Sequence, residues 1–252
     1  MSQFRFADLP FRAKLSYIAH AFKGIYKQHH KYLFPVMRRI LDNDAVVFDV
    51  GGHGGQYAKL FAKVARQGKI FSFEPSSYSC SILRRVISAN GLGHVKVIHA
   101  GLSDAPGTLT LKTPLKKSGT FRYGVATLGN SSWTGDFFEE ECPLITIDDV
   151  VKKENLNRLD FIKIDVEGWE LRVLMGGESS IRKLHPAILV ELNDDSLTRA
   201  GDSLQWAWDQ LTEWGYRAVS QTDPETLVDI IGDPIEGDIY WFHAEGPGPE
   251  SS

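Results

Sequence analysis

The chain has little cysteine and no long apolar run. Cys80 and Cys142 are its only cysteines in 252 residues, and their spacing offers neither a disulfide framework nor a Cys-x-x-Cys metal site. No segment approaches the roughly 18 uninterrupted apolar residues that a membrane span needs. Arg5, Asp8 and Arg12 interrupt any apolar signal core at the N-terminus. We therefore expect a cytoplasmic protein without a transmembrane segment.

The chain also lacks an overall positive charge. Its formal net charge is -4 at pH 7, which argues against a general nucleic-acid-binding protein. The charge is uneven, because residues 1–40 hold eight Lys or Arg and one acid, Asp8. A basic segment can meet an anionic substrate, lipid headgroups or RNA, or it can be the solvated face of a helix.

Short apolar runs alternate with amphipathic segments from residue 45 onward. This rhythm predicts an α/β fold with a doubly wound, mostly parallel sheet covered by helices on both faces. Residues 216–219 and 239–242 are expected to close the sheet as a hairpin-like pair, and residues 109–111 to form a separate hairpin. The other predicted strands are 45–49, 69–74, 95–98, 144–147, 161–165 and 187–191.

Three regions flank or interrupt this pattern. Residues 1–44 are expected to form a helical cap on the ligand-binding domain, 45–245. Residues 114–142 are rich in Gly, Ser and Thr and long for a connection, so we expect a lid or substrate loop. The tail, 246–252, is expected to be disordered. The aromatic residues of the loop, which could clamp a substrate or fill the core, include Trp133, Phe137 and Phe138.

A glycine-rich turn, Asp-Val-Gly-Gly-His-Gly-Gly at 49–55, follows the first strand and precedes a predicted helix that starts at Gln56. Such a turn brings a ligand close to backbone N–H groups at a helix N-terminus. The dinucleotide fingerprint G-x-G-x-x-G fails in both frames, at Tyr57 in one and at His53 in the other. Asp49 also suits a pyrophosphate poorly. A cationic ligand such as S-adenosylmethionine fits better.

Four acids fall at or near the carboxyl ends of predicted strands: Asp49, Glu74, Asp165 and Glu191. Ligands of doubly wound sheets bind at this edge, so these side chains are expected to line one crevice. Glu74 suits a bidentate hold on ribose hydroxyls, although dinucleotide folds use a similar acid.

The most specific motif of the chain is Lys-Ile-Asp-Val-Glu-Gly-Trp-Glu at 163–170. With this motif, the residues from about 46 to 192 resemble the FkbM family of S-adenosylmethionine-dependent methyltransferases. The resemblance implies a class I methyltransferase fold, with a Rossmann-like sheet of seven strands, and methylation of oxygen on a sugar or secondary metabolite. The other segments that carry it are 49–55, 73–75, 102–104, 147–149 and 186–191.

The resemblance also implies site residues. The glycine turn would shape the methionine end of the cofactor pocket, and the turn at 100–104 would pass the adenine. The family usually has Ala-Asn where this chain has Gly52-His53, which removes an asparagine contact. The cofactor-binding residues are then Asp49, Gly51, Gly52, Gly55, Gln56, Glu74, Gly101, Ser103 and Asp165.

Three residues are candidates for catalysis. Asp165 would lie beside the methyl group, or act as a structural acid. Glu167 could be a base or could stabilise a helix N-terminus, and His53 could accept a proton or simply belong to the loop. Methyl transfer needs a way to remove the hydroxyl proton. Asp165, Glu191 and Asn193 supply oxygen ligands that could instead hold Mg²⁺ for this purpose.

The sequence therefore predicts an S-adenosylmethionine-dependent O-methyltransferase whose acceptor is a small molecule: a sugar, a glycoside or a polyketide-like compound. Nucleic acid is not an expected partner, and a homo-oligomer is left open. A dehydrogenase on the same sheet and a non-catalytic binding protein are the alternatives, because a fold does not establish an activity.

Overall fold

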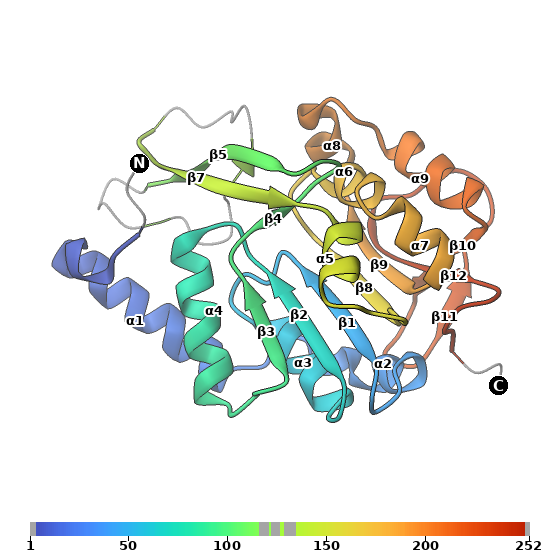
Figure 1. The fold of residues 1–252 in the computed structure, drawn as a ribbon, viewed down its shortest axis with the longest axis horizontal. Coiled ribbons are helices and arrows are strands. Elements are labelled where there is room, and N and C mark those ends of the chain that lie inside the picture. The colour runs from blue at the N-terminus through green and yellow to red at the C-terminus, as the bar shows by residue number, and fades with distance from the viewer. Residues whose placement is uncertain (1–3, 116–120, 122–126, 129–134, 250–252) are drawn as a thin grey trace.

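The larger of two sheets forms the centre of the computed structural model, which describes residues 4–115, 121, 127–128 and 135–249. Within these residues the sheet has eight strands (Figure 1). Their order is β11 (Leu227–Asp229), β10 (Tyr216–Gln221), β12 (Gly237–His243), β9 (Ala187–Leu192), β8 (Phe161–Ile164), β1 (Val46–Val50), β2 (Lys69–Phe73) and β3 (Val95–Ile98).

Five neighbouring strands, β9, β8, β1, β2 and β3, run parallel. The predicted pairing of 216–219 with 239–242 is confirmed, because β10 and β12 are antiparallel neighbours. The sheet has one strand more than the seven that the resemblance implies, since the short edge strand β11 pairs with β10. The predicted strand 144–147 does not belong to it, because residues 144–145 pair in the second sheet and a helix begins at Ile147. In this register Asp49 lies between Ser72 on β2 and Lys163 on β8.

Helices cover both faces of the sheet, as the alternating pattern predicts. Apolar side chains of α2 (Phe34–Ile40), α3 (Gln56–Val64) and α4 (Ser77–Ala89) pack on one face. The other face is covered by α5 (Ile147–Lys153), α6 (Glu170–Met175), α7 (Glu178–Leu184), α8 (Asp194–Ala200) and α9 (Leu204–Glu213). Among the described residues, no helix combines the length and the apolar character that crossing a bilayer requires.

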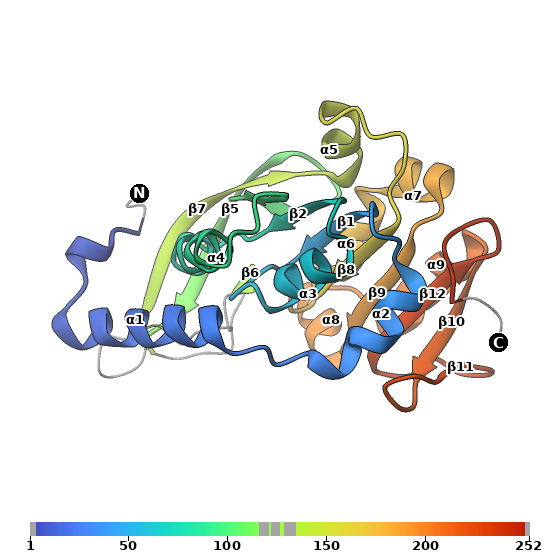
Figure 2. The same cartoon turned by 90° about the horizontal axis from the view of Figure 1, so that it is seen from below.

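The N-terminal segment is helical, as expected, but in separate pieces. It forms η1 (Phe6–Asp8), α1 (Phe11–Tyr26) and η2 (Lys31–Leu33) before α2. Helix α1 lies along α4, and Figure 2 shows it on the outer side of the molecule. The buried Lys59 ammonium of α3 donates to the carbonyls of Gly24 and Lys27, which ties the end of α1 to the main domain.

The second sheet lies over the carboxyl ends of β1, β2 and β3 (Figure 1). Its strands are β4 (Gly101–Leu102), β7 (Phe137–Ile145), β5 (Gly107–Pro114) and β6 (Thr127–Leu128). The predicted hairpin around residue 110 is confirmed, because β5 and β7 pair antiparallel along the whole of β5.

Part of the expected lid is therefore a strand, since residues 137–142 belong to β7. Phe138 packs against Phe121, while Trp133 lies outside the described residues. At the other end of the chain, Gly246 donates its N–H to the carbonyl of His243. The expected disorder of 246–252 stays a prediction, and residues 250–252 are likewise not described.

Candidate active site

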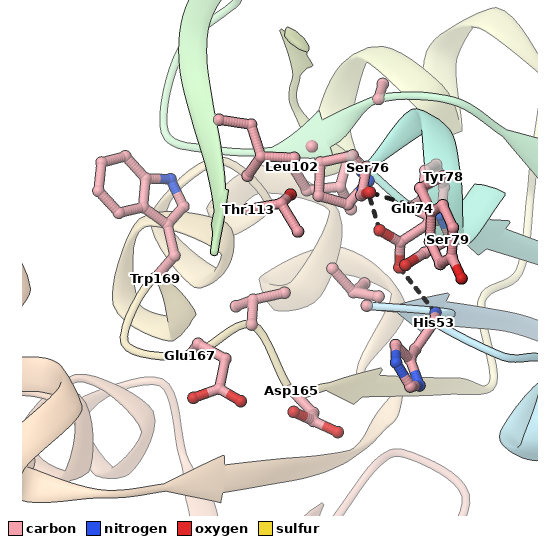
Figure 3. Close-up of a pocket in the computed structure, with 18 of the residues that line it drawn as sticks. His53, Glu74, Ser76, Tyr78, Ser79, Leu102, Thr113, Asp165, Glu167 and Trp169 are labelled. Atoms are coloured by element: carbon pink, nitrogen blue, oxygen red, sulfur yellow. Dashed lines mark hydrogen bonds between the residues drawn. The ribbon is translucent and has the colours of Figure 1, made fainter. Parts of the chain in front are cut away.

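A cavity of about 300 Å³ lies at the carboxyl ends of β1, β2, β8 and β9, beneath the β5–β7 hairpin. This is the edge at which parallel sheets bind their ligands. Figure 3 shows Asp165 and Glu167 on one side of it and Glu74 on the other. The predicted site residues that line it are Gly51, His53, Glu74, Gly101, Asp165, Glu167 and Glu191.

Beneath the glycine turn lies a buried lysine that the sequence prediction did not include in the site. The Nζ atom of Lys163 donates to the carbonyls of Val50 (3.2 Å) and Gly51 (3.0 Å). It also lies 3.2 Å from Oδ2 of Asp165 and 3.9 Å from Oδ1 of Asp49. Burial opposes its charge, but the two carboxylates outweigh burial and raise the pKa of Lys163. The lysine therefore links the turn to Asp165.

Asp49 does not reach the cavity surface. Its side chain is fully buried and accepts a hydrogen bond from the Ser72 hydroxyl at 2.7 Å. Burial raises the pKa of Asp49, although Lys163 and Ser72 act in the opposite direction. In this position Asp49 supports the floor of the site, and a direct contact with a cofactor is not part of the geometry.

The glycines of the turn make room for protein atoms. A Cβ at Gly51, where φ is +80°, would clash with the carbonyl oxygen of Asp165, and a Cβ at Gly52 would clash with the Ser72 hydroxyl. Gly52 and Gly55 lie behind the cavity wall, which is formed here by Gly51 and His53. The close packing between the turn and Asp165 therefore depends on Gly51.

Gln56 and Ser103 do not line the cavity either, and each holds a neighbouring part of the protein in place. The Oε1 atom of Gln56 accepts the N–H of His29 at 3.1 Å, so this side chain holds the N-terminal segment. Ser103 is buried and accepts a hydrogen bond from the indole N–H of Trp169 at 3.1 Å. Trp169 itself lines the cavity, so Ser103 positions a wall residue.

Glu74 faces the cavity at the end of β2. Its two carboxylate oxygens accept backbone N–H groups, from His53 at 2.7 Å and from Ser76 at 2.9 Å. Burial raises the pKa of Glu74 to about 7, although these hydrogen bonds act in the opposite direction. Each carboxylate oxygen can accept a second hydrogen bond, which matches the two hydroxyls of a ribose.

His53 occupies a left-handed conformation, with φ at 43°. Burial, together with Lys163, lowers the pKa of His53 to about 4, so its imidazole is neutral at physiological pH. A group with this pKa is a weak proton acceptor. The role that the geometry gives His53 is the backbone hydrogen bond to Glu74.

Three acids line another part of the cavity: Asp165, Glu167 and Glu191. Asp165 and Glu167 lie across the cavity from Glu74 (Figure 3). Burial and a shared hydrogen bond with Asp165 raise the pKa of Glu191 to about 8. Burial also acts to raise the pKa of Asp165, but Lys163 outweighs burial and lowers it. At neutral pH Asp165 is thus the anion and Glu191 holds the proton between them. Burial and the neighbouring Asp165 raise the pKa of Glu167.

Helix α6 begins at Glu170, so Glu167 lies outside it. Glu167 precedes it with φ at 55°, so it does not belong to the first turn. Glu170, and not Glu167, is the acid that stabilises the backbone at this helix N-terminus. Its buried Oε1 atom accepts the N–H groups of Val166 and Gly168, both at 3.1 Å, and this fixes the segment that carries Asp165 and Glu167.

The predicted magnesium ligands are only partly brought together. Asp165 and Glu191 are hydrogen-bonded to each other. The Oδ1 atom of Asn193, however, accepts the N–H of Ser196 at 2.9 Å and caps α8. The third oxygen ligand is therefore engaged elsewhere, and the donor set does not fit Mg²⁺.

A different group of potential ligands, His185, His243 and Glu245, lies at the opposite edge of the sheet. The two imidazole rings are stacked, with centroids 3.9 Å apart and planes within 7°. The nitrogen lone pairs of two parallel rings do not point toward one ion, so the two histidines form a stacked ring pair rather than a metal site.

The β5–β7 hairpin adds wall residues that sequence reasoning missed. Leu111 and Thr113 on β5, with Phe121, line the cavity from above, and Tyr78 closes one side. Nothing in the local sequence signals this contact. The buried Lys163, in contrast, is visible as a single charge inside an apolar strand.

Residues 49–218 match the family model of the methyltransferase FkbM domain. The chain belongs to this family. This methyltransferase is 26% identical over 209 residues to methyltransferase sdnD of Sordaria araneosa, covering 68% of this chain and 81% of that one. It is 27% identical to hexuronic acid methyltransferase AglP of Haloferax volcanii, covering 63% and 61% of the two chains.

It is also 24% identical to 2-O-methyltransferase NoeI of Sinorhizobium fredii, covering 61% of this chain and 65% of that one. The chain thus spans less than two thirds of the length of AglP and of NoeI. A crystal structure of methyltransferase FkbM from Methylobacillus flagellatus KT superposes with a TM-score of 0.49 and 16% identity, covering 80% of this chain and 44% of that one.

The family assignment confirms the predicted resemblance and the class I methyltransferase fold. It also decides against the dehydrogenase alternative. The protein is a methyltransferase of an S-adenosylmethionine-dependent family, and its cavity lies at the carboxyl ends of the parallel strands, the edge at which doubly wound sheets bind ligands.

Proposed function

We propose that this methyltransferase methylates a hydroxyl oxygen of a small, polyhydroxylated acceptor: a sugar, a glycoside or a polyketide-like compound. The observation that carries the proposal is the carboxyl pair Asp165 and Glu191, which line the cavity together and share a hydrogen bond. Asp165 lies across the cavity from Glu74 (Figure 3). Two relatives are named for comparable chemistry, one as a hexuronic acid methyltransferase and one as a 2-O-methyltransferase.

The residues present fit S-adenosylmethionine. This cofactor supplies a methyl group on a sulfonium cation, and its ribose carries two hydroxyls. Glu74 has free acceptor capacity for those hydroxyls at one side of the cavity. The anionic Asp165 lies at the other side and suits a positive charge. Gly51 and Gly101 also line the cavity.

Glu191 is the proton acceptor in this proposal. The best general base has a pKa near the working pH, and the pKa of Glu191 is raised to about 8. Asp165 is a weaker base, because Lys163 stabilises its anion. Asp165 therefore holds Glu191 in place and faces the cation, while the ionised Glu191 takes the hydroxyl proton.

The test uses the full chain with radiolabelled S-adenosylmethionine and a panel of hexuronic acids, glycosides and hydroxylated polyketides. The expected result is transfer to at least one acceptor, with an O-methyl signal in the NMR spectrum of the product. An N-methylated or C-methylated product would overturn the proposal. Tight binding of S-adenosylhomocysteine without transfer to any acceptor would instead support a non-catalytic binding protein.

A further inference from the structure

Helix α1 exposes a row of large apolar side chains. They recur every three or four residues along the helix, which places them on one side of it. They are Phe11 (75% exposed), Leu15 (52%), Ile18 (54%), Phe22 (61%) and Tyr26 (71%). We call these five residues the α1 ridge. Contiguous apolar surface of this kind marks an interaction site.

The ridge points away from the protein. At about 100° per residue, its members fall within a sector of roughly 80°. The opposite side of α1, with Ala13, Tyr17, Ala21 and Gly24, is buried against α4. Figure 2 shows α1 along the outside of the molecule. The buried side alone attaches the helix to the domain, so attachment does not explain the ridge.

Positive charge borders the ridge on both sides, and α1 contains no Asp or Glu. On a helical projection Arg12 and Lys23 lie along one side of the ridge and Lys14 along the other. Arg12 and Lys23 are exposed, as is Lys27, which follows the helix. An apolar ridge between rows of basic residues is the arrangement of helices that lie in the interface of an anionic membrane.

We propose that α1 docks this protein on an anionic phospholipid surface, with the ridge in the headgroup region and the basic residues on the phosphates. Charge complementarity selects this occupant. A second copy packed ridge to ridge would bring the basic borders together without an acid on either helix. A nucleic acid would engage the charges but would leave the apolar ridge in water.

The proposal does not depend on the acceptor, but it has a consequence for the cavity. On the buried side of α1, the Nδ1 atom of His20 lies 3.0 Å from the hydroxyl of Tyr78, and Tyr78 lines the cavity. A surface-bound α1 would therefore hold the cavity close to the membrane.

The experiment is flotation of the full chain with vesicles of phosphatidylcholine alone or with about 30 mol% phosphatidylserine. Wild-type protein is expected to bind the anionic vesicles and to be released by high salt. The ridge variant Ile18→Ser/Phe22→Ser should lose at least about tenfold in partitioning. The border variant Arg12→Glu/Lys23→Glu should lose binding to a similar extent, because all four side chains are exposed.

Matched controls change comparable residues away from α1. Trp206→Ser removes an apolar side chain that is 58% exposed on α9, and Lys153→Glu reverses an exposed charge on α5. Both should bind vesicles like wild type. Circular dichroism and S-adenosylhomocysteine binding verify folding, and the border variant tests the proposal independently if the ridge variant unfolds.

Failure of the wild-type chain to bind anionic vesicles would overturn the proposal, as would ridge and border variants that bind these vesicles as well as wild type does. A dimer in light scattering that the ridge variant converts to a monomer would show instead that a second copy covers the ridge. Binding to RNA in place of vesicles would equally refute docking on lipid.

Discussion

The Nζ atom of Lys163 lies 3.2 Å from Oδ2 of Asp165, and only 3% of the lysine side chain is exposed. The same ammonium donates to the carbonyl of Gly51 in the glycine turn. One buried cation thus holds both the turn that follows β1 and the carboxylate that follows β8. The two halves of the cavity floor are coupled through it.

Lys163→Met should destabilise the protein by about 3–5 kcal/mol, because it leaves the Asp49 carboxyl buried without a cation. Urea unfolding measures this loss. The double variant Lys163→Met/Asp49→Asn removes the buried charge as well and should be more stable than Lys163→Met alone. A double variant that loses the sum of the two single effects would show that the two side chains are not coupled.

The pH profile should report Glu191. A general base works in its ionised form, and the pKa of Glu191 is raised to about 8. The value of kcat/KM should therefore rise with pH, about tenfold per unit, and level off above the pKa. Glu191→Gln should lower kcat by about a hundredfold or more and remove this limb. Asp195→Asn, an exposed acid on α8, is the control. The range from pH 6 to pH 9 extends roughly one unit or more on either side of this pKa. A kcat/KM that stays constant over this range would contradict the role of Glu191 as the base.

Chelation should leave the activity unchanged. Asn193 caps α8, so only Asp165 and Glu191 remain from the predicted magnesium set. The measurement is methyl transfer after dialysis against EDTA, with and without added Mg²⁺. Activity that falls in EDTA and returns with Mg²⁺ would restore the metal hypothesis and displace Glu191 as the base.

Cofactor affinity should increase with pH around neutrality. Burial raises the pKa of Glu74 to about 7, above the ordinary value, so the carboxyl is partly protonated at neutral pH. Its ionised form is the better acceptor for ribose hydroxyls, and this form grows as the pH rises through the pKa. Calorimetry with S-adenosylhomocysteine should show that the affinity of the wild-type protein rises with pH. Glu74→Gln should bind at least about tenfold more weakly (~1.4 kcal/mol), and its affinity should not depend on pH in this range. Equal affinities of the two proteins would remove Glu74 from the site.

Local patterning explains what could be predicted from the sequence. Short apolar runs that end in an acid predict strands whose carboxyl ends share one edge, and Glu74, Asp165 and Glu191 do line one cavity there. The prediction for Asp49 was less accurate. Its position at a strand end was correct, but only the sheet register, which places it between Ser72 and Lys163, shows that it is buried.

The features of the site that could not be predicted depend on contacts between residues far apart in the sequence or on the backbone conformation. The roof of the cavity comes from Leu111 and Thr113, on a hairpin whose placement depends on pairing between β5 and β7, some 30 residues apart in the chain. The roles of Glu167 and Glu170 could not be distinguished from the sequence either, because both are acids near a helix N-terminus. Only the backbone distinguishes them, through the positive φ of Glu167.

Glu170 should be a positioning residue whose effect on activity passes through the 165–168 segment. Its Oε1 atom accepts the N–H groups of Val166 and Gly168, and the side chain is buried. Glu170→Ala leaves these donors unpaired, at a cost of about 1–3 kcal/mol in stability. It should lower kcat at least about tenfold, because Asp165 loses its fixed placement. Glu170→Gln retains a carbonyl oxygen at the same position and should keep kcat within about twofold of wild type.

Steady-state kinetics and urea unfolding of the Glu170→Ala and Glu170→Gln variants test this prediction. If Glu170→Gln is as impaired as Glu170→Ala, the charge of Glu170 matters rather than its hydrogen bonds. Full activity in Glu170→Ala would mean that the segment is held by its packing alone.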